Sequence, residues 1–141
     1  MAANIVTTTW IQNTLFKSDN PSGNHVFTDT LNDNNKTNKS LTPKAMMLSS
    51  LAGCSGLDVT SVLKKMKSTI DAFKMEITGE LSEEHPVIYH TVTVDYHFYG
   101  TALDEDKINK AVKLSVDKYC GVMEMFRKFA EVKTNNHFHH Q

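Results

Sequence analysis

The stretch TPKAMMLSSLAGCSGLDVTSVLKKM, residues 42–66, decides the fold of this chain. It opens with Thr42, a favourable N-cap residue, and Pro43, which is accepted at the first helical position. The apolar side chains that follow cover nearly the whole circumference of a helix. Because such a helix must be enclosed on most sides, and the chain is short, a second copy is the economical partner. We therefore predict a central helix over 43–66, buried within a homodimer.

Outward from this helix, the hydrophobic pattern changes to the period of strands. Residues 4–12 and 25–30 are rich in β-branched and aromatic side chains, which favours strands. The predicted order along the chain is N-terminal strands within 1–31, a polar loop over 32–42, the central helix, a β-hairpin over 67–100, helices over 103–130, and a final strand with a tail over 131–141. This order predicts a single α+β domain over 1–141, with antiparallel sheets around the helix.

Composition limits the possible functions. The 141 residues carry a formal net charge of −1, and Arg127 is the single arginine, so an electrostatic nucleic-acid binder is not expected. The N-terminus has no signal-peptide pattern, and no purely apolar run reaches the length of a membrane span. We therefore expect a cytoplasmic protein that binds neither nucleic acid nor membrane, in a compartment where thiols are kept reduced.

The two cysteines, Cys54 and Cys120, are the residues best suited to chemistry. No Cys-x-x-Cys motif is present, and no histidine stands at zinc-ligand spacing from a cysteine, so no metal and no cofactor are expected. His90 and His97 form a poor ligand pair, and the terminal cluster His137, His139 and His140 is expected to be a polar tail. From composition alone, two unrelated buried thiols are the favoured interpretation.

Two motifs resemble the OsmC/Ohr family. Residues 40–59, SLTPKAMMLSSLAGCSGLDV, match its proline-led helix eleven residues ahead of a cysteine, and residues 114–122, LSVDKYCGV, match its second cysteine motif. Trp10, Phe16 and the stretch 23–29 fit the N-terminal strands of one branch, so the similarity covers about residues 5–135. The resemblance implies an OsmC-like fold and an intertwined homodimer with active sites at the subunit interface.

The resemblance also implies a reaction. Cys54 is expected to attack a hydroperoxide, and Cys120 is expected to resolve the resulting sulfenic acid as a disulfide, which a thiol reductant then reduces. The chemistry is consistent with this, because a thiolate is the nucleophile and a sulfenic acid without a resolving thiol oxidises further.

The chain departs from the family at the groups that activate the thiol. The active reductases of the family place an arginine on the N-terminal strands and a glutamate near the start of the central helix. Here the first 126 residues lack arginine, and the helix positions nine and ten before Cys54 are Ala45 and Lys44. Lys17, His25 or Lys44 could supply positive charge instead, with Lys17 preferred, and Asp58 could supply a carboxylate. A lysine lacks the guanidinium fork, so slow peroxidase activity is expected.

The absence of these activating groups favours an alternative function, that of a binding protein. In it, the apolar pocket of the dimer binds a hydrophobic or thiol-reactive small molecule without catalysis, and the cysteines serve packing or sensing. The two retained cysteines favour the enzyme, and the missing arginine and glutamate favour the binding protein. A purely structural dimer module is a third possibility.

Overall fold

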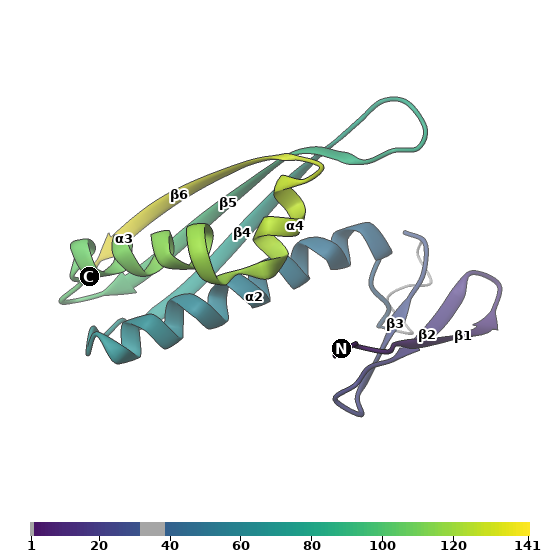
Figure 1. The fold of residues 1–141 in the computed structure, drawn as a ribbon, viewed down its shortest axis with the longest axis horizontal. Helices are drawn as coiled ribbons and strands as arrows, with labels where there is room; N and C mark the ends of the chain where they lie inside the picture. The colour runs from purple at the N-terminus through teal and green to yellow at the C-terminus, as the bar shows by residue number, and fades with distance from the viewer. Residues whose placement is uncertain (1, 32–38) are drawn as a thin grey trace. The chain divides into compact units, whose positions relative to one another are not determined.

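A computed structural model describes residues 2–31 and 39–141 of the chain. The chain divides into two compact units, Met1–Met47 and Leu48–Gln141, and each is described by itself. The first unit contains the strands β1, β2 and β3, and the second contains a sheet with helices (Figure 1). The fold is therefore α+β, as predicted. Most of the predicted polar loop, residues 32–38, lies outside the described residues.

The N-terminal unit contains an antiparallel sheet in the order β1-β2-β3, formed by Thr7–Gln12, Leu15–Asp19 and His25–Thr28. The sequence pattern predicted the outer two strands and missed β2, which pairs with both. Asn13 and Thr14 form the tight turn into β2, and Asn13 has φ 49°. Asparagine tolerates this left-handed conformation, so Asn13 was the available signal for a hairpin.

The C-terminal unit contains a second sheet in the order β4-β5-β6, formed by Ala72–Leu81, Tyr89–Gly100 and Glu131–His140. β4 and β5 form the predicted antiparallel hairpin. β6 pairs with β5 in parallel, from Thr91 opposite Glu131 to Gly100 opposite His140, so the prediction of antiparallel sheets was wrong for this strand. The helices between β5 and β6 return the chain to the start of β5, which a parallel pair requires.

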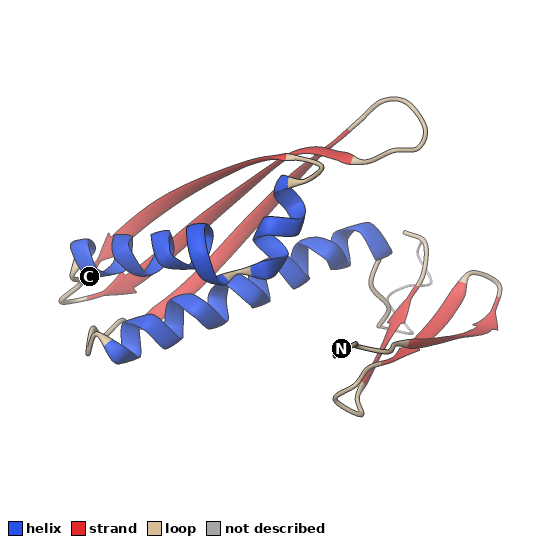
Figure 2. Cartoon of the chain, viewed as in Figure 1, coloured by secondary structure: helices blue, strands red, loops and turns tan. Residues whose placement is uncertain are grey.

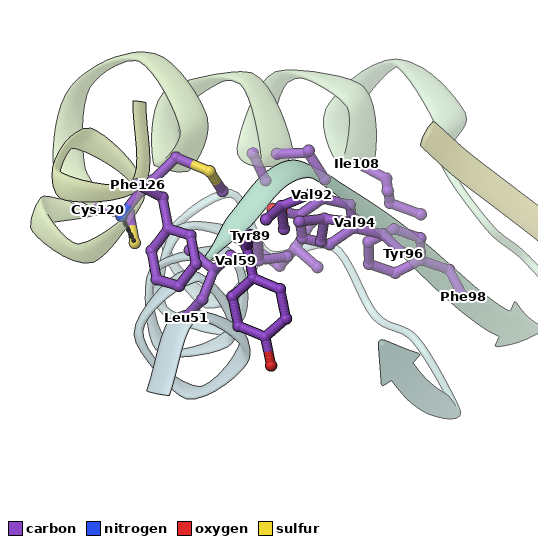
Figure 3. Close-up of a cluster of buried hydrophobic side chains, with 14 residues drawn as sticks. Leu51, Val59, Tyr89, Val92, Val94, Tyr96, Phe98, Ile108, Cys120 and Phe126 are labelled. Carbon is purple, nitrogen blue, oxygen red and sulfur yellow. Dashed lines mark hydrogen bonds between the residues drawn. The ribbon is translucent and has the colours of Figure 1, made fainter. Parts of the chain in front are cut away.

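Among the residues that the structure describes, the helical segments are α2 at Pro43–Lys65, α3 at Glu105–Leu114, the π-helix η1 at Ser115–Tyr119, and α4 at Gly121–Arg127. In the C-terminal unit the helices cover one face of the sheet (Figure 2). β5 turns Val92, Val94, Tyr96 and Phe98 toward them, and all four are fully buried (Figure 3). This layer of apolar contacts is the core that fixes the positions of α2 and α4.

α2 is buried along one stripe in the single chain. Its buried residues are Leu51, Ser55, Val59 and Leu63, spaced four apart on one face. Leu57, on another face, is 72% exposed. Among the described residues this helix alone is long and apolar enough to cross a membrane by length and composition, a criterion that the core helix of a soluble protein also meets. Its complete burial inside a homodimer stays a prediction.

Candidate functional site

Cys54, Asp58 and Cys120 come together in the C-terminal unit. The two sulfur atoms and one carboxylate oxygen of Asp58 all lie within 4.8 Å of one another. Cys54 and Asp58 share a face of α2 because they are one turn apart. Both cysteines are free thiols; Cys54 is half-buried and Cys120 is buried. The structure therefore brings the two predicted catalytic residues together with one of the predicted activating groups.

Cys120 is positioned by the change from one helix to the next. It ends the π-helix η1 with an extended backbone, φ −79° and ψ 102°, and its N–H donates to the Ser115 carbonyl at 2.9 Å. Its Sγ then caps α4 by accepting from the Met123 N–H at 3.3 Å. The break between η1 and α4 at Cys120 is thus an N-cap whose side chain is the thiol. π-Helical turns occur frequently at functional sites, because they redirect a side chain.

A buried network of hydroxyl groups lies against the cluster. The Ser55 Oγ lies 2.6 Å from the Tyr96 hydroxyl and 2.8 Å from the Ser115 Oγ. The Ser115 hydroxyl also lies 3.2 Å from the Asp58 Oδ2, to which it can donate. Ser55, Ser115 and Tyr96 are fully buried. Because a fully satisfied buried network fixes its members in place, this one orients the Asp58 carboxylate.

Sequence reasoning missed this network. Its members come from α2, β5 and η1, and the bonded pairs are 41 and 60 positions apart in the chain. A serine inside the apolar face of the helix, at Ser55, was the one available signal. A hydroxyl at a core position needs a partner, but the sequence does not say which residue provides it.

The surroundings favour the neutral forms of two groups. Burial raises the pKa of Cys120 to about 11, and its hydrogen bond to Cys54 acts in the same direction, while the Met123 N–H opposes the shift. Burial also raises the pKa of Tyr96 to about 12, opposed by its hydrogen bond to Ser55. Cys120 is thus a protonated thiol at neutral pH, beside the more exposed sulfur of Cys54.

The other predicted activating groups belong to the N-terminal unit. Lys17 on β2 lies 3.8 Å from Asp19 in an exposed ion pair, and His25 meets Phe27 edge-on with ring centroids 5.3 Å apart. Lys44 is exposed at the second position of α2. An activating role for these three residues stays a prediction.

Two cations of the C-terminal unit were not proposed from the sequence. Lys65 lines a pocket of about 320 Å³ that opens beside Asp58, together with Ser61, Val62 and Tyr119. Arg127, on α4, donates to the Val116 carbonyl of η1 and pairs with Glu124 at 3.0 Å. Its charge lowers the pKa of Tyr96, in opposition to burial. The C-terminal unit therefore carries positive charge at the C-terminal ends of two helices, from Lys65 on α2 and Arg127 on α4.

Three histidines near the C-terminus, His137, His139 and His140, lie on strand β6. β6 runs through His140, so the expected polar tail at His137, His139 and His140 is strand, and that expectation was wrong. His97 Nδ1 lies 3.0 Å from His139 Nε2, and His137 Nε2 lies 2.8 Å from an Asp95 oxygen. The histidine side chains of β6 are ordered because this strand pairs in parallel with β5. The sequence pattern of β6 alone could not indicate that pairing.

Comparison with known proteins agrees with the fold and the cysteine motifs. The family model described as OsmC-like protein matches residues 36–135. The chain therefore belongs to the OsmC-like protein family, and the resemblance seen in the sequence is confirmed. Protein YhfA of Escherichia coli K12 is 29% identical over 123 residues, covering 87% of this chain and 89% of YhfA.

Solved structures share the whole fold. A hypothetical protein from Aquifex aeolicus VF5 superposes with a TM-score of 0.87 at 28% identity, over 100% of this chain and 99% of that one. The organic hydroperoxide resistance protein OhrB of Bacillus subtilis superposes with a TM-score of 0.64 at 18% identity, over 96% and 98% of the two chains. At this lower identity, the likeness to OhrB shows a common fold.

Proposed function

We propose that this protein is a thiol-dependent peroxidase that reduces hydroperoxides with Cys54 and Cys120. The observation that carries the proposal is the proximity of the two sulfurs, within 4.8 Å, in a chain of the OsmC-like family. Organic hydroperoxide resistance proteins are among the structures with this fold. Family membership supports a peroxide-related stress function, and the paired thiols supply a reaction for it.

The exposure of the two thiols supports a division of roles. Cys54, the more accessible sulfur, attacks the terminal oxygen of the hydroperoxide; the O–O bond breaks, and the alcohol leaves with a proton. The product is a sulfenic acid on Cys54. Cys120 then attacks that sulfur as a thiolate, the S–O bond breaks, and water leaves as the disulfide forms. An external thiol reductant returns both cysteines to the reduced state.

The neighbouring polar groups fit this sequence of steps. In the proposal, Asp58 accepts the proton of a thiol and returns it to the leaving oxygen, since it lies close to both sulfurs and is oriented by Ser115. Lys65 offers positive charge at the pocket beside Asp58, where a leaving alkoxide needs it. Lys17, His25 and Lys44 are the proposed additional cations, supplied by the N-terminal unit of either subunit of a homodimer.

We further propose that the chain acts as a homodimer in the cytoplasm. The exposed side of α2 supports dimerisation, because a large apolar residue such as Leu57 is costly to leave in water. A reducing compartment supports the cycle, because it provides the thiol reductant.

Peroxide consumption tests the proposed reaction. Reduced wild-type protein is mixed with cumene hydroperoxide, or separately with hydrogen peroxide, and the remaining peroxide is measured with and without dithiothreitol. Wild type should consume peroxide repeatedly with dithiothreitol present. Cys54→Ser should consume none above the buffer rate.

The matched control is Cys120→Ser, which keeps the attacking sulfur. It should consume one equivalent and leave a sulfenic acid that dimedone labels at Cys54. Equal rates for wild type and Cys54→Ser would contradict the proposal.

Non-catalytic binding is the second candidate, and the raised pKa of Cys120 favours it, because a thiol at neutral pH is a poor nucleophile. In this case the site holds a hydrophobic or thiol-reactive small molecule. Wild type and both cysteine variants would then share the buffer rate of peroxide loss, while a thiol-reactive probe would still label Cys54.

A further inference from the structure

The three groups of the site form a set of metal ligands as well as a thiol pair. Cys54, Cys120 and Asp58 provide two sulfurs and a carboxylate oxygen, all within 4.8 Å of one another. In a tetrahedral zinc site, with Zn–S near 2.3 Å and Zn–O near 2.0–2.2 Å, neighbouring ligand atoms are separated by roughly 3.5–4 Å. Small rotations of these three side chains therefore suffice to close the set around one ion.

The groups around these ligands are those that a metal site requires. The Met123 N–H donates to the Cys120 Sγ at 3.3 Å, and the Ser115 hydroxyl lies 3.2 Å from the Asp58 Oδ2. Ser115 is itself held by the buried Ser55. Such outer hydrogen bonds orient metal ligands and offset the negative charge of thiolates and carboxylates. The arrangement is fixed by α2, η1 and α4, so it is preformed in the folded chain.

The ligand types determine the class of ion. Two thiolates select a soft or borderline cation such as Zn²⁺ over Mg²⁺ or Ca²⁺, which prefer oxygen ligands. Cys54 and Asp58 are half-buried, and the pocket of about 320 Å³ lined by Asp58 and Lys65 gives access from solvent. A water molecule from this pocket can take the fourth position.

We propose that the reduced protein binds one thiophilic divalent cation, Zn²⁺, through Cys54, Cys120 and Asp58. Since the same sulfurs form the disulfide, metal binding and oxidation exclude each other. Oxidation of the loaded site balances as follows: two thiolates and one hydroperoxide, with two protons from water, give the disulfide, one alcohol, one water and the free ion. The release of the ion on oxidation rests on the proposed function, whereas binding of the ion by the reduced protein does not.

Cobalt spectroscopy tests the binding without peroxide. Reduced protein is titrated with Co²⁺ under argon, and the thiolate-to-cobalt charge-transfer absorption is recorded; Zn²⁺ is then added against a chromophoric chelator. One ion per chain should bind, with the absorption present, and Zn²⁺ should displace Co²⁺. Cys54→Ser or Cys120→Ser should greatly weaken the absorption and the affinity for Zn²⁺. Ser115→Ala should lower the affinity roughly 10- to 100-fold.

Histidine side chains are common ligands of Co²⁺ and Zn²⁺, so the matched control is His97→Ala with His139→Ala, which should keep the thiolate absorption unchanged. A measurement on wild type keeps the test valid if a variant fails to fold. Zn²⁺ should slow the alkylation of both cysteines, and a chelator should restore the rate of alkylation. Absence of the charge-transfer band in reduced wild type, or the same affinity in Asp58→Ala, would overturn the metal site. Neither result bears on peroxide consumption by the metal-free protein, which tests the proposed function separately.

Discussion

At the scale of the residue, the site depends on buried polar side chains that satisfy one another's hydrogen bonds. Ser55 is bonded to both Tyr96 and Ser115, and Ser115 reaches Asp58. The proximity of Cys54 and Cys120 was an expectation from family resemblance and is confirmed by the geometry. The hydroxyl network could not be predicted, because local sequence patterns do not encode partners from three separate elements.

The network predicts how stability depends on alkaline pH. Burial raises the pKa of Tyr96 from its ordinary value near 10 to about 12, so the unfolded chain loses this proton first. The stability associated with neutral Tyr96 is therefore fully present below pH 10 and is lost as pH rises from about 10 to 12. The free energy of unfolding of wild type and of Tyr96→Phe is measured with denaturant across this pH range. It should fall less steeply with pH in the variant than in wild type.

The matched control is Tyr119→Phe, because Tyr119 is 52% exposed. This variant should keep the wild-type slope. Identical slopes for wild type and Tyr96→Phe would contradict the assignment of the shift to this buried hydroxyl.

At the scale of the element, the sequence predicted the types of most segments and failed where pairing is non-local. Thr42-Pro43 and the apolar pattern predicted the helix that the structure places at Pro43–Lys65. β2 was missed because its five residues follow a turn with Asn-Thr in place of the usual Asn-Gly. The parallel direction of β6 depends on where α3, η1 and α4 return the chain, which no local pattern records.

The two faces of α2 predict different costs for the same substitution. Leu51 is fully buried in the core and Leu57 is 72% exposed in the single chain. Leu51→Ala should lower the free energy of unfolding by about 2–5 kcal/mol through lost contacts and a cavity. For a monomer, Leu57→Ala should change it by less than about 0.5 kcal/mol.

Urea unfolding at several protein concentrations measures both effects. If α2 is enclosed by a second copy as proposed, the cost of Leu57→Ala rises well above that limit, and the midpoint depends on concentration. A small, concentration-independent cost at Leu57 would argue against the proposed interface. An equally small cost at Leu51 would contradict its place in the core.

At the scale of the whole molecule, the homodimer is the prediction with the widest consequences, because the proposed active site draws cations from the N-terminal unit of either subunit. Sedimentation velocity at low micromolar concentration should show a stable dimer, with an interface in the obligate class of about 2,000 Å² or more. A well-folded monomer under these conditions would contradict the dimer.

The central claim is that Cys54 and Cys120 are a redox pair, and its most direct test is the product of one turnover. Reduced wild type is treated with one equivalent of cumene hydroperoxide without reductant, quenched with an alkylating agent, and analysed by intact mass and peptide mapping. We predict that the chain loses the mass of two hydrogen atoms and yields one linked peptide pair containing Cys54 and Cys120. Two alkylated cysteines, or an oxygen atom added to Cys54 with Cys120 still free, would contradict the claim.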